Sequence, residues 1–167
     1  MQKTPKVTFQ DFLDKFPEIE LPVTISADME LEFSRRNEPL SAIMIEKLIA
    51  AIEGETPDEF TEFVPCFKLP KTDGFHAIVY WKAGLMNYQY VLATMDLKGT
   101  LIDKSVIAGT YSDGNMLVQS VATIEEDWII YIVSGQSHAD KTKEYDASAS
   151  KAFNLELLAT GEIITSD

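Results

Sequence analysis

The order of hydrophobic and polar residues in the segment 85–109 predicts a β-hairpin. Side chains alternate from Tyr88 to Met95, with Tyr88, Tyr90, Leu92 and Thr94 on one face and Gln89, Val91, Ala93 and Met95 on the other. This period of two is the one that a pleated strand imposes. The polar residues 96–99 follow, and Gly99 can take the positive φ that a short hairpin loop requires. We therefore expect a return strand over Thr100–Ala108.

Similar apolar runs, separated by short polar links, fill the C-terminal part of the chain. They predict strands over 75–81, 86–95, 100–108, 116–124, 128–133, 152–158 and 162–165, with an extended piece over 63–69 and one more short strand around 143–146. Short links favour antiparallel neighbours, because a parallel partner requires a long crossover. The run Trp128–Val133 does not alternate, so we expect it at the centre of the sheet with both faces covered. The polar segment Ser134–Ser150 is expected to be the longest loop.

The N-terminal part shows helical spacing instead. The residues Thr8–Phe16 predict a helix with a threonine cap at its start and a proline after its end. A second helix is expected over Pro39–Glu53, where apolar residues cover most of the circumference and Gly54 supplies a stop signal. Between the two helices, Ile19–Ile25 alternates as a strand whose proline favours an edge position. No element is assigned to 27–37.

These elements predict an α+β protein in which N-terminal helices pack on a curled antiparallel meander sheet of about six to eight strands. A chain of 167 residues is the size of one domain. We therefore expect a single α+β domain over 1–167, with a helical part at 1–62 and an antiparallel β part at 63–167.

The negative charge of the chain argues against some classes of binding partner. Lysine and arginine number 14 against 27 aspartate and glutamate residues, which gives a formal net charge of -13. This field repels phosphate backbones and anionic lipid head groups, so nucleic-acid and membrane partners are not expected. The single cysteine allows no intrachain disulfide, and the first residues lack the apolar core of a signal peptide. We expect a soluble, cytoplasmic protein, although a chain from which a leader had been removed would have the same sequence.

Motifs for catalysis or metal binding are few. Gly135-Gln136-Ser137-His138-Ala139 approximates the nucleophile elbow of α/β-hydrolases, but its last position is alanine and no histidine follows it. We interpret it as a polar hairpin loop. Neither His76 nor His138 has a second ligand at metal-binding spacing, and Asp113-Gly114-Asn115 is interpreted as a tight turn. Cys66 is expected to be a buried, inert thiol. No glycine-rich phosphate loop is present, so neither a metal nor a cofactor is predicted.

Three carboxylates are the candidate catalytic residues. Asp103 lies on the return strand of the hairpin, Asp113 in the next loop, and Asp127 just before the run 128–133. If they meet at one rim of the sheet, one could act as a general acid and another as a general base. They define the alternative function, a small carboxylate-dependent hydrolase.

Aromatic residues concentrate in the β part of the chain. The candidate binding residues are Tyr80, Trp81, Tyr88, Tyr90 and Tyr111, and Trp128 and Tyr131 belong to the same group. Rings with a polar tip suit half-exposed surfaces that bind peptides, sugars or another subunit. The same rings could instead fill core and cross-strand positions.

Two short stretches carry a resemblance. The segment 9–25, with Phe-Pro-Glu-Ile-Glu-Leu-Pro at 16–22, and the Leu-Ile-Asp at 101–103 after the hairpin glycine resemble a type of small bacterial α+β protein to which no activity is assigned. The resemblance implies no catalytic residue. We therefore predict, from the rings and the charge, a non-catalytic binding or protein-interaction domain whose aromatic, acid-rimmed surface engages a protein partner or a second copy of the chain.

Overall fold

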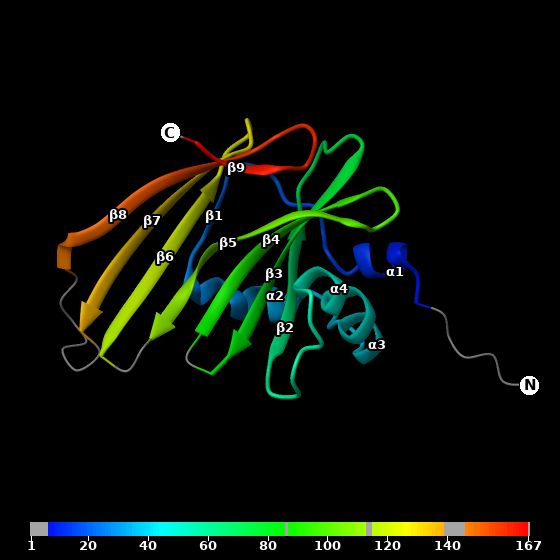
Figure 1. The fold of residues 1–167 in the computed structure, drawn as a ribbon, viewed down its shortest axis with the longest axis horizontal. Helices are drawn as coiled ribbons and strands as arrows, with labels where there is room; N and C mark the ends of the chain where they lie inside the picture. The colour runs from blue at the N-terminus through cyan, green and yellow to red at the C-terminus, as the bar shows by residue number, and fades with distance from the viewer. Residues whose placement is uncertain (1–6, 86, 113–114, 139–145, 167) are drawn as a thin grey trace, which may run out of the picture.

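The computed structural model describes residues 7–85, 87–112, 115–138 and 146–166. These residues form one antiparallel sheet of nine strands, with short helices packed against it (Figure 1). Strands β2 to β9 neighbour one another in the order in which they occur along the chain, and β1 pairs with β6. The predicted antiparallel meander is therefore confirmed, with nine strands in place of the six to eight expected. Because most of the structure is sheet, the α+β description applies only roughly.

The strands are long relative to the links between them. Their bounds are β1 Val23–Ile25, β2 Glu62–Lys68, β3 Phe75–Gly84, β4 Asn87–Asp96, β5 Leu101–Ser112, β6 Met116–Ile124, β7 Ile129–His138, β8 Asp146–Leu157 and β9 Ile163–Ser166. The predicted edge strand over 19–25 is reduced to the three residues of β1, which pair with the end of β6. Residue Glu18, just before this segment, makes a separate bridge to Lys68 of β2.

The predicted polar loop over 134–150 is wrong. Strand β7 continues to His138 and β8 begins at Asp146, so that Ser134 lies opposite Lys151 and Gln136 opposite Asp146. Ladder hydrogen bonds join backbone groups, and small polar residues can therefore extend a strand without adding apolar surface. The Gly135 to His138 part of the elbow-like string lies in this strand rather than in a hairpin loop. The strand expected around 143–146 falls largely on residues 143–145, which lie outside the described residues.

The helices are short. They are α1 Phe9–Leu13, the 3₁₀ turn η1 Ala27–Met29, α2 Glu30–Arg36, and a continuous segment made of α3 Ala42–Met44, the π-helical η2 Ile45–Ile49 and α4 Ala50–Glu53. Thr8 caps α1 as predicted, accepting a hydrogen bond of 3.0 Å from the backbone N–H of Asp11. Gly54 ends the long segment with a φ of 79°. Within the described part of the chain, no helix has the length and apolar content needed to span a membrane.

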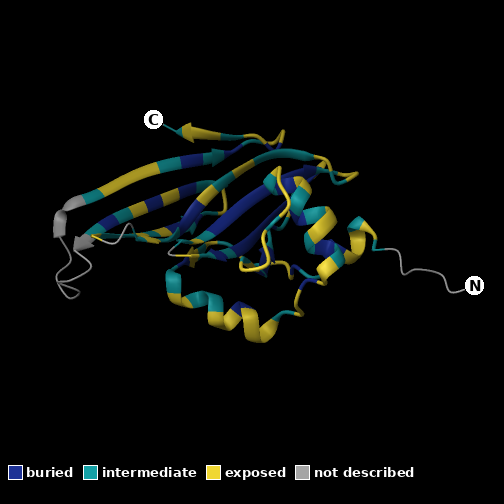
Figure 2. Ribbon diagram, turned by 60° about the horizontal axis from the view of Figure 1, so that its bottom comes forward, coloured by how far each residue is buried: buried dark blue, intermediate teal, exposed yellow. Residues whose placement is uncertain are grey.

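Two apolar clusters lie on the two faces of the sheet, and they follow the alternation predicted for β4. Tyr90 and Leu92 pack in the cluster shared with β6 to β8, whereas Val91, Ala93 and Met95 pack under α1 and the segment 42–53. The first cluster joins residues from β2 to β8, as in the edge-to-face contact of Phe75 with Trp128. The sheet must therefore curl around this cluster. Figure 2 shows the buried positions concentrated on the central strands.

The prediction that 128–133 has both faces covered is wrong. Ile130 and Ile132 of β7 are buried, but Tyr131 and Val133 keep 43% and 49% of their surface exposed. Strand β7 does lie between β6 and β8. The uninterrupted apolar run identified a strand inside the sheet, but only the face that carries Ile130 and Ile132 packs into the apolar cluster.

Candidate functional site

Three of the five predicted binding residues meet in one cleft. Its lining consists of Ala27, Glu30, Trp81, Tyr88, Tyr90, Gly109 and Thr110, and we call it the aromatic cleft. These residues come from η1 and α2 on one side and from β3, β4 and β5 on the other. The cleft has a volume of about 370 Å³, which is within the range of ~300–1,000 Å³ that small-ligand sites occupy.

The sheet places the Trp81 and Tyr88 rings against each other. Trp81 lies opposite Tyr90 in the ladder between β3 and β4, and Tyr88 is diagonal to Trp81 on the same face. The Trp81 and Tyr88 rings stack with centroids 5.8 Å apart and an interplanar angle of 11°. Trp81 is buried, whereas Tyr88 is 43% exposed. The stack therefore presents an aromatic surface to solvent at the mouth of the cleft.

Tyr90 is fully buried beneath this stack, and its hydroxyl is used inside the protein. The Tyr90 hydroxyl donates a hydrogen bond of 3.0 Å to the carbonyl oxygen of Ser26, just before η1. Burial raises the pKa of Tyr90, and the nearby Cys66, Glu30 and Asp28 act in the same direction. Tyr90 thus contributes its ring to the cleft and fixes the segment that carries Glu30, but it does not offer a dissociable proton at neutral pH.

Helix α2 holds Glu30 over the cleft through contacts further along the helix. The ring of Phe33 packs on Phe67 of β2 with a centroid distance of 5.8 Å. At the end of the helix, the side-chain amide of Asn37 donates hydrogen bonds of 2.7 and 2.9 Å to the carbonyl oxygens of Pro65 and Cys66. These contacts also cover part of the edge strand β2. The Tyr90 bond holds the start of η1, and the Phe33 and Asn37 contacts hold α2, so both sides of Glu30 are attached to the sheet.

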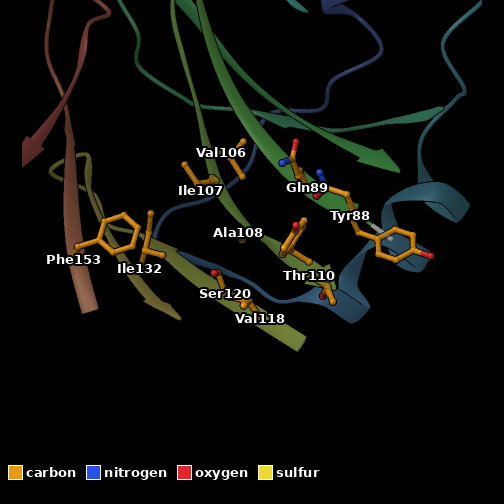
Figure 3. Close-up of a pocket in the computed structure, with 13 residues that line it drawn as sticks. Tyr88, Gln89, Val106, Ile107, Ala108, Thr110, Val118, Ser120, Ile132 and Phe153 are labelled. Carbon is orange, nitrogen blue, oxygen red and sulfur yellow. The ribbon is translucent and has the colours of Figure 1, made fainter. Parts of the chain in front are cut away.

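A second hollow adjoins the aromatic cleft and shares Tyr88, Gly109 and Thr110 with it. We call it the adjacent hollow, and Figure 3 shows Phe153 and Ile132 on one side of it and Gln89 and Tyr88 on the other. Several of its apolar residues are solvent-exposed, namely Tyr88, Val106, Tyr111 and Phe153, with exposed fractions between 43% and 51%. The predicted residue Tyr111 lies here. The cleft and the hollow meet at Tyr88, Gly109 and Thr110, whereas Val106 also lines a depression with Glu53 and Lys82.

Gly109 of β5 lines both the aromatic cleft and the adjacent hollow, and its backbone lies very close to the backbone of Tyr88 in β4. It has a φ of 147°, and a Cβ atom added there would lie 2.1 Å from the carbonyl oxygen of Tyr88. No side chain fits at that distance, so the position requires glycine. The backbone contact fixes the strand segment from which the Tyr88 ring projects.

Tyr80, the fifth predicted binding residue, lies on the opposite face of the sheet. Its ring is fully buried, and its hydroxyl donates a hydrogen bond of 2.6 Å to the carboxylate of Glu53 at the end of α4. Lys82 forms an ion pair with the same carboxylate, and the Lys104 amine donates to the Glu53 carbonyl oxygen at 3.2 Å. Burial and the bond to Glu53 raise the pKa of Tyr80. This group attaches α4 to the sheet and is separate from the aromatic cleft.

Two of the candidate catalytic carboxylates, Asp103 and Asp127, lie within the described residues and accept hydrogen bonds from backbone N–H groups. Asp103 accepts hydrogen bonds of 2.8 Å from Lys104 N–H and 2.9 Å from Ile163 N–H, which ties β5 to β9. Asp127 accepts 3.1 Å from Ile129 N–H in the turn before β7. Neither residue lines the aromatic cleft or the adjacent hollow. Asp113 lies outside the described residues, and a catalytic role for any of the three stays a prediction.

Another depression lies at the other end of the sheet. It is lined by Glu18, Ile19, Glu20, Leu21, Pro70, Lys71, Glu126 and Trp128, and we call it the acidic cleft. Its volume is about 670 Å³, larger than that of the aromatic cleft. Trp128 has a φ of 66° and its ring packs edge-to-face on Phe75. The Trp128 ring is partly buried against the apolar cluster, whereas Tyr88 of the Trp81 and Tyr88 stack is 43% exposed.

Two other residues considered in the sequence, Cys66 and His76, are packed against neighbouring side chains. Cys66 is fully buried as predicted, and burial raises the pKa of its thiol. His76 packs edge-to-face on Phe9 with a centroid distance of 5.6 Å, and partial burial together with Lys68 lowers its pKa. Among the residues that the structure describes, no three His, Cys, Asp or Glu side chains gather closely enough to hold a metal ion.

Sequence reasoning selected the rings of the cleft but missed its carboxylate. Tyr88 and Tyr90 are two apart on a predicted strand, so their common face could be read from the alternation. Glu30 lies in the segment 27–37, to which no element was assigned. Only the tertiary contacts of Phe33 and Asn37 bring it to the rings. No family model matched the chain, and searches of curated proteins and of solved structures found no match either.

Proposed function

We propose that this chain is a non-catalytic domain that binds a protein partner through the aromatic cleft and the adjacent hollow. One observation carries the proposal: four of the rings expected to bind, those of Trp81, Tyr88, Tyr90 and Tyr111, line two adjoining depressions, and Tyr88 and Tyr111 are about half exposed there. Half-exposed aromatic residues next to apolar side chains are enriched where proteins contact partners.

The exposed side chains of the adjacent hollow support a macromolecular partner. Tyr111 and Phe153 together with Tyr88 place apolar surface on three different strands, β5, β8 and β4. Single exposed apolar residues are common on monomeric proteins, but a contiguous group next to a cleft indicates an interaction site. Burying these side chains requires a surface larger than a small molecule supplies.

A comparative capture experiment tests this proposal. Proteins retained from native cells by the immobilised wild-type chain would be identified, purified and titrated against wild type, Tyr88→Ala and Tyr131→Ala. Tyr131 is a matched control, because it is also 43% exposed but does not line the cleft or the hollow. We expect at least about a tenfold loss of affinity for Tyr88→Ala, since a central aromatic contact contributes ~2 kcal/mol or more, and little change for Tyr131→Ala.

Equal affinities for the two variants would place the binding surface elsewhere and contradict the proposal. The hydrolase alternative is tested in parallel with a panel of ester, phosphoester and glycoside substrates. Turnover that Asp103→Asn or Asp127→Asn abolishes, in a variant that remains folded by circular dichroism, would replace the binding proposal with the catalytic one.

A further inference from the structure

We infer that the group recognised in the aromatic cleft is the side chain of an arginine in a basic segment of the partner. This inference rests on the proposed function and specifies its ligand. The cleft combines aromatic ring faces with one carboxylate, and no lysine or arginine occurs in its described lining. That combination of groups suits a positively charged, partly apolar ligand.

The first argument concerns the rings. The face of an aromatic ring carries negative potential, and cations are attracted to it, most strongly to tryptophan and tyrosine. Trp81 and Tyr88 are stacked on each other, so a ligand meets the part of Tyr88 that the stack leaves exposed. A planar guanidinium group can continue such a stack, whereas an ammonium group acts as a point charge.

The second argument concerns Glu30. Within the described part of the chain, no side chain donates a hydrogen bond or forms an ion pair with its carboxylate, in contrast to Glu53, which is bound by Tyr80 and Lys82. Burial raises the pKa of the neighbouring Tyr90 and Cys66, and the negative charge of Glu30 acts on both in the same direction. A carboxylate beside exposed ring surface can bind a guanidinium through charge-assisted hydrogen bonds while the ring stacks on it.

The third argument concerns the nature of the partner. Each chain carries a formal net charge of -13, so two copies repel each other and a basic partner is attracted. Asp28, two residues before Glu30, is exposed and strengthens the negative field near Tyr90, whereas Glu32 forms an ion pair of 3.5 Å with Arg36. The charge therefore favours a different, basic protein over a second copy of this chain.

The test uses Trp81 as the reporter. The chain contains two tryptophans, so a Trp128→Phe background leaves Trp81 as the only one. Its fluorescence is titrated with a capped Gly-Arg-Gly-Arg-Gly peptide and with the same peptide carrying citrulline, which keeps the shape of arginine but lacks its charge. We expect saturable binding of the arginine peptide and at least about fivefold weaker binding of the citrulline peptide, the size of a moderate cation–π and ionic contribution.

Two matched pairs of variants locate the binding. Tyr88→Leu and Glu30→Gln should each weaken binding of the arginine peptide by about three- to thirtyfold. Tyr131→Leu removes an equally exposed ring elsewhere, and Glu46→Gln makes the same change in net charge on the helical segment over the other face of the sheet. Both controls should stay within about a factor of two of the background affinity. Glu30 also lies in the first turn of α2, so each variant is checked by thermal unfolding.

Equal binding of the two peptides, absence of saturable binding, or equal effects of Glu30→Gln and Glu46→Gln would overturn the inference. The proposed function can survive that result. If the captured partner still requires Tyr88 but is insensitive to Glu30→Gln and to salt, the cleft binds a protein through an uncharged group. If the partner binds independently of Tyr88, the proposed function itself fails.

Discussion

The hydroxyl of Tyr80 donates a hydrogen bond of 2.6 Å to the carboxylate of Glu53, which joins the middle of β3 to the end of α4. Only 7% of the Glu53 side chain is exposed, and Lys82 forms an ion pair with it. The carboxylate is therefore buried with its partners in place. Its surroundings attach the helical segment 42–53 to the sheet, and they lead to two predictions.

Replacing Tyr80 with phenylalanine removes one donor and keeps the ring. We expect Tyr80→Phe to lower the free energy of unfolding by ~1–3 kcal/mol, because the buried charge of Glu53 loses a hydrogen bond. Denaturation in urea measures this change. Tyr131→Phe is the control, and it should change stability by less than ~0.5 kcal/mol because its ring is half exposed. Equal effects of the two substitutions would show that the Tyr80 bond is not stabilising.

The same carboxylate predicts a dependence of stability on pH. Burial raises the pKa of Glu53, but the hydrogen bonds from Lys82 and Tyr80 and the charges of Lys82 and Lys104 outweigh it, so the pKa lies below its ordinary value of 4.5. A lowered folded-state pKa gives stability that is present above pH 4.5 and is lost as the pH falls through the folded-state pKa. The stability difference between wild type and Glu53→Gln should therefore shrink in acid. A difference that stays constant across an acid titration would contradict the network.

Replacing Gly109 with alanine is expected to cause a steric clash between β5 and β4. Gly109→Ala places a Cβ atom 2.1 Å from the carbonyl oxygen of Tyr88 at a φ of 147°, and we expect a loss of at least ~1–3 kcal/mol. Gly84 is the matched control, since a Cβ atom there has only the Asn87 carbonyl oxygen at 4.0 Å. Gly84→Ala should stay within ~0.5 kcal/mol of wild type in thermal or urea unfolding. Similar losses at both positions would mean that the close approach at Tyr88 is not the cause.

Thr94 of β4 is a fully buried polar residue. Its hydroxyl lies 2.6 Å from the carbonyl oxygen of Gly161 in the turn between β8 and β9, to which it donates. Thr94→Val keeps the shape but leaves this carbonyl without a donor, and we expect a loss of ~1–3 kcal/mol. Amide hydrogen exchange should quicken in β9 before the central strands. An unchanged exchange rate in β9 would argue against this attachment.

The sheet could be predicted because its determinants are local. Alternation in 88–95, the glycine at 99 and the short polar links are sufficient to indicate antiparallel neighbours. Helix α2 could not be predicted, because Met29, Leu31 and Phe33 are spaced as in a strand and only Phe33 is buried. A helix with one anchoring residue is stabilised by its tertiary contacts rather than by its own pattern.

The candidate site shows the same division. The rings on β3 and β4 could be chosen from residue type and strand position, but the sequence did not separate Tyr80, which faces the other way, from Trp81. Adjacent residues of a strand point to opposite faces of the sheet, so the structure places Trp81 in the aromatic cleft and Tyr80 under the helical segment 42–53. The position of Glu30 depends on contacts between segments that are distant in the sequence. No local pattern encodes such a contact, so the carboxylate of the cleft appears only in the folded chain.

The two tryptophans allow the most direct test of arginine binding in the aromatic cleft. Trp81 lines the aromatic cleft and Trp128 lines the acidic cleft, so their indole N–H signals in a nitrogen-15 NMR spectrum report on the two sites separately. Addition of the arginine peptide should shift the Trp81 signal in a saturable way and leave the Trp128 signal in place, with the Trp81 shift lost in Tyr88→Leu. A shift confined to Trp128, or no shift of the Trp81 signal, would contradict binding in the aromatic cleft.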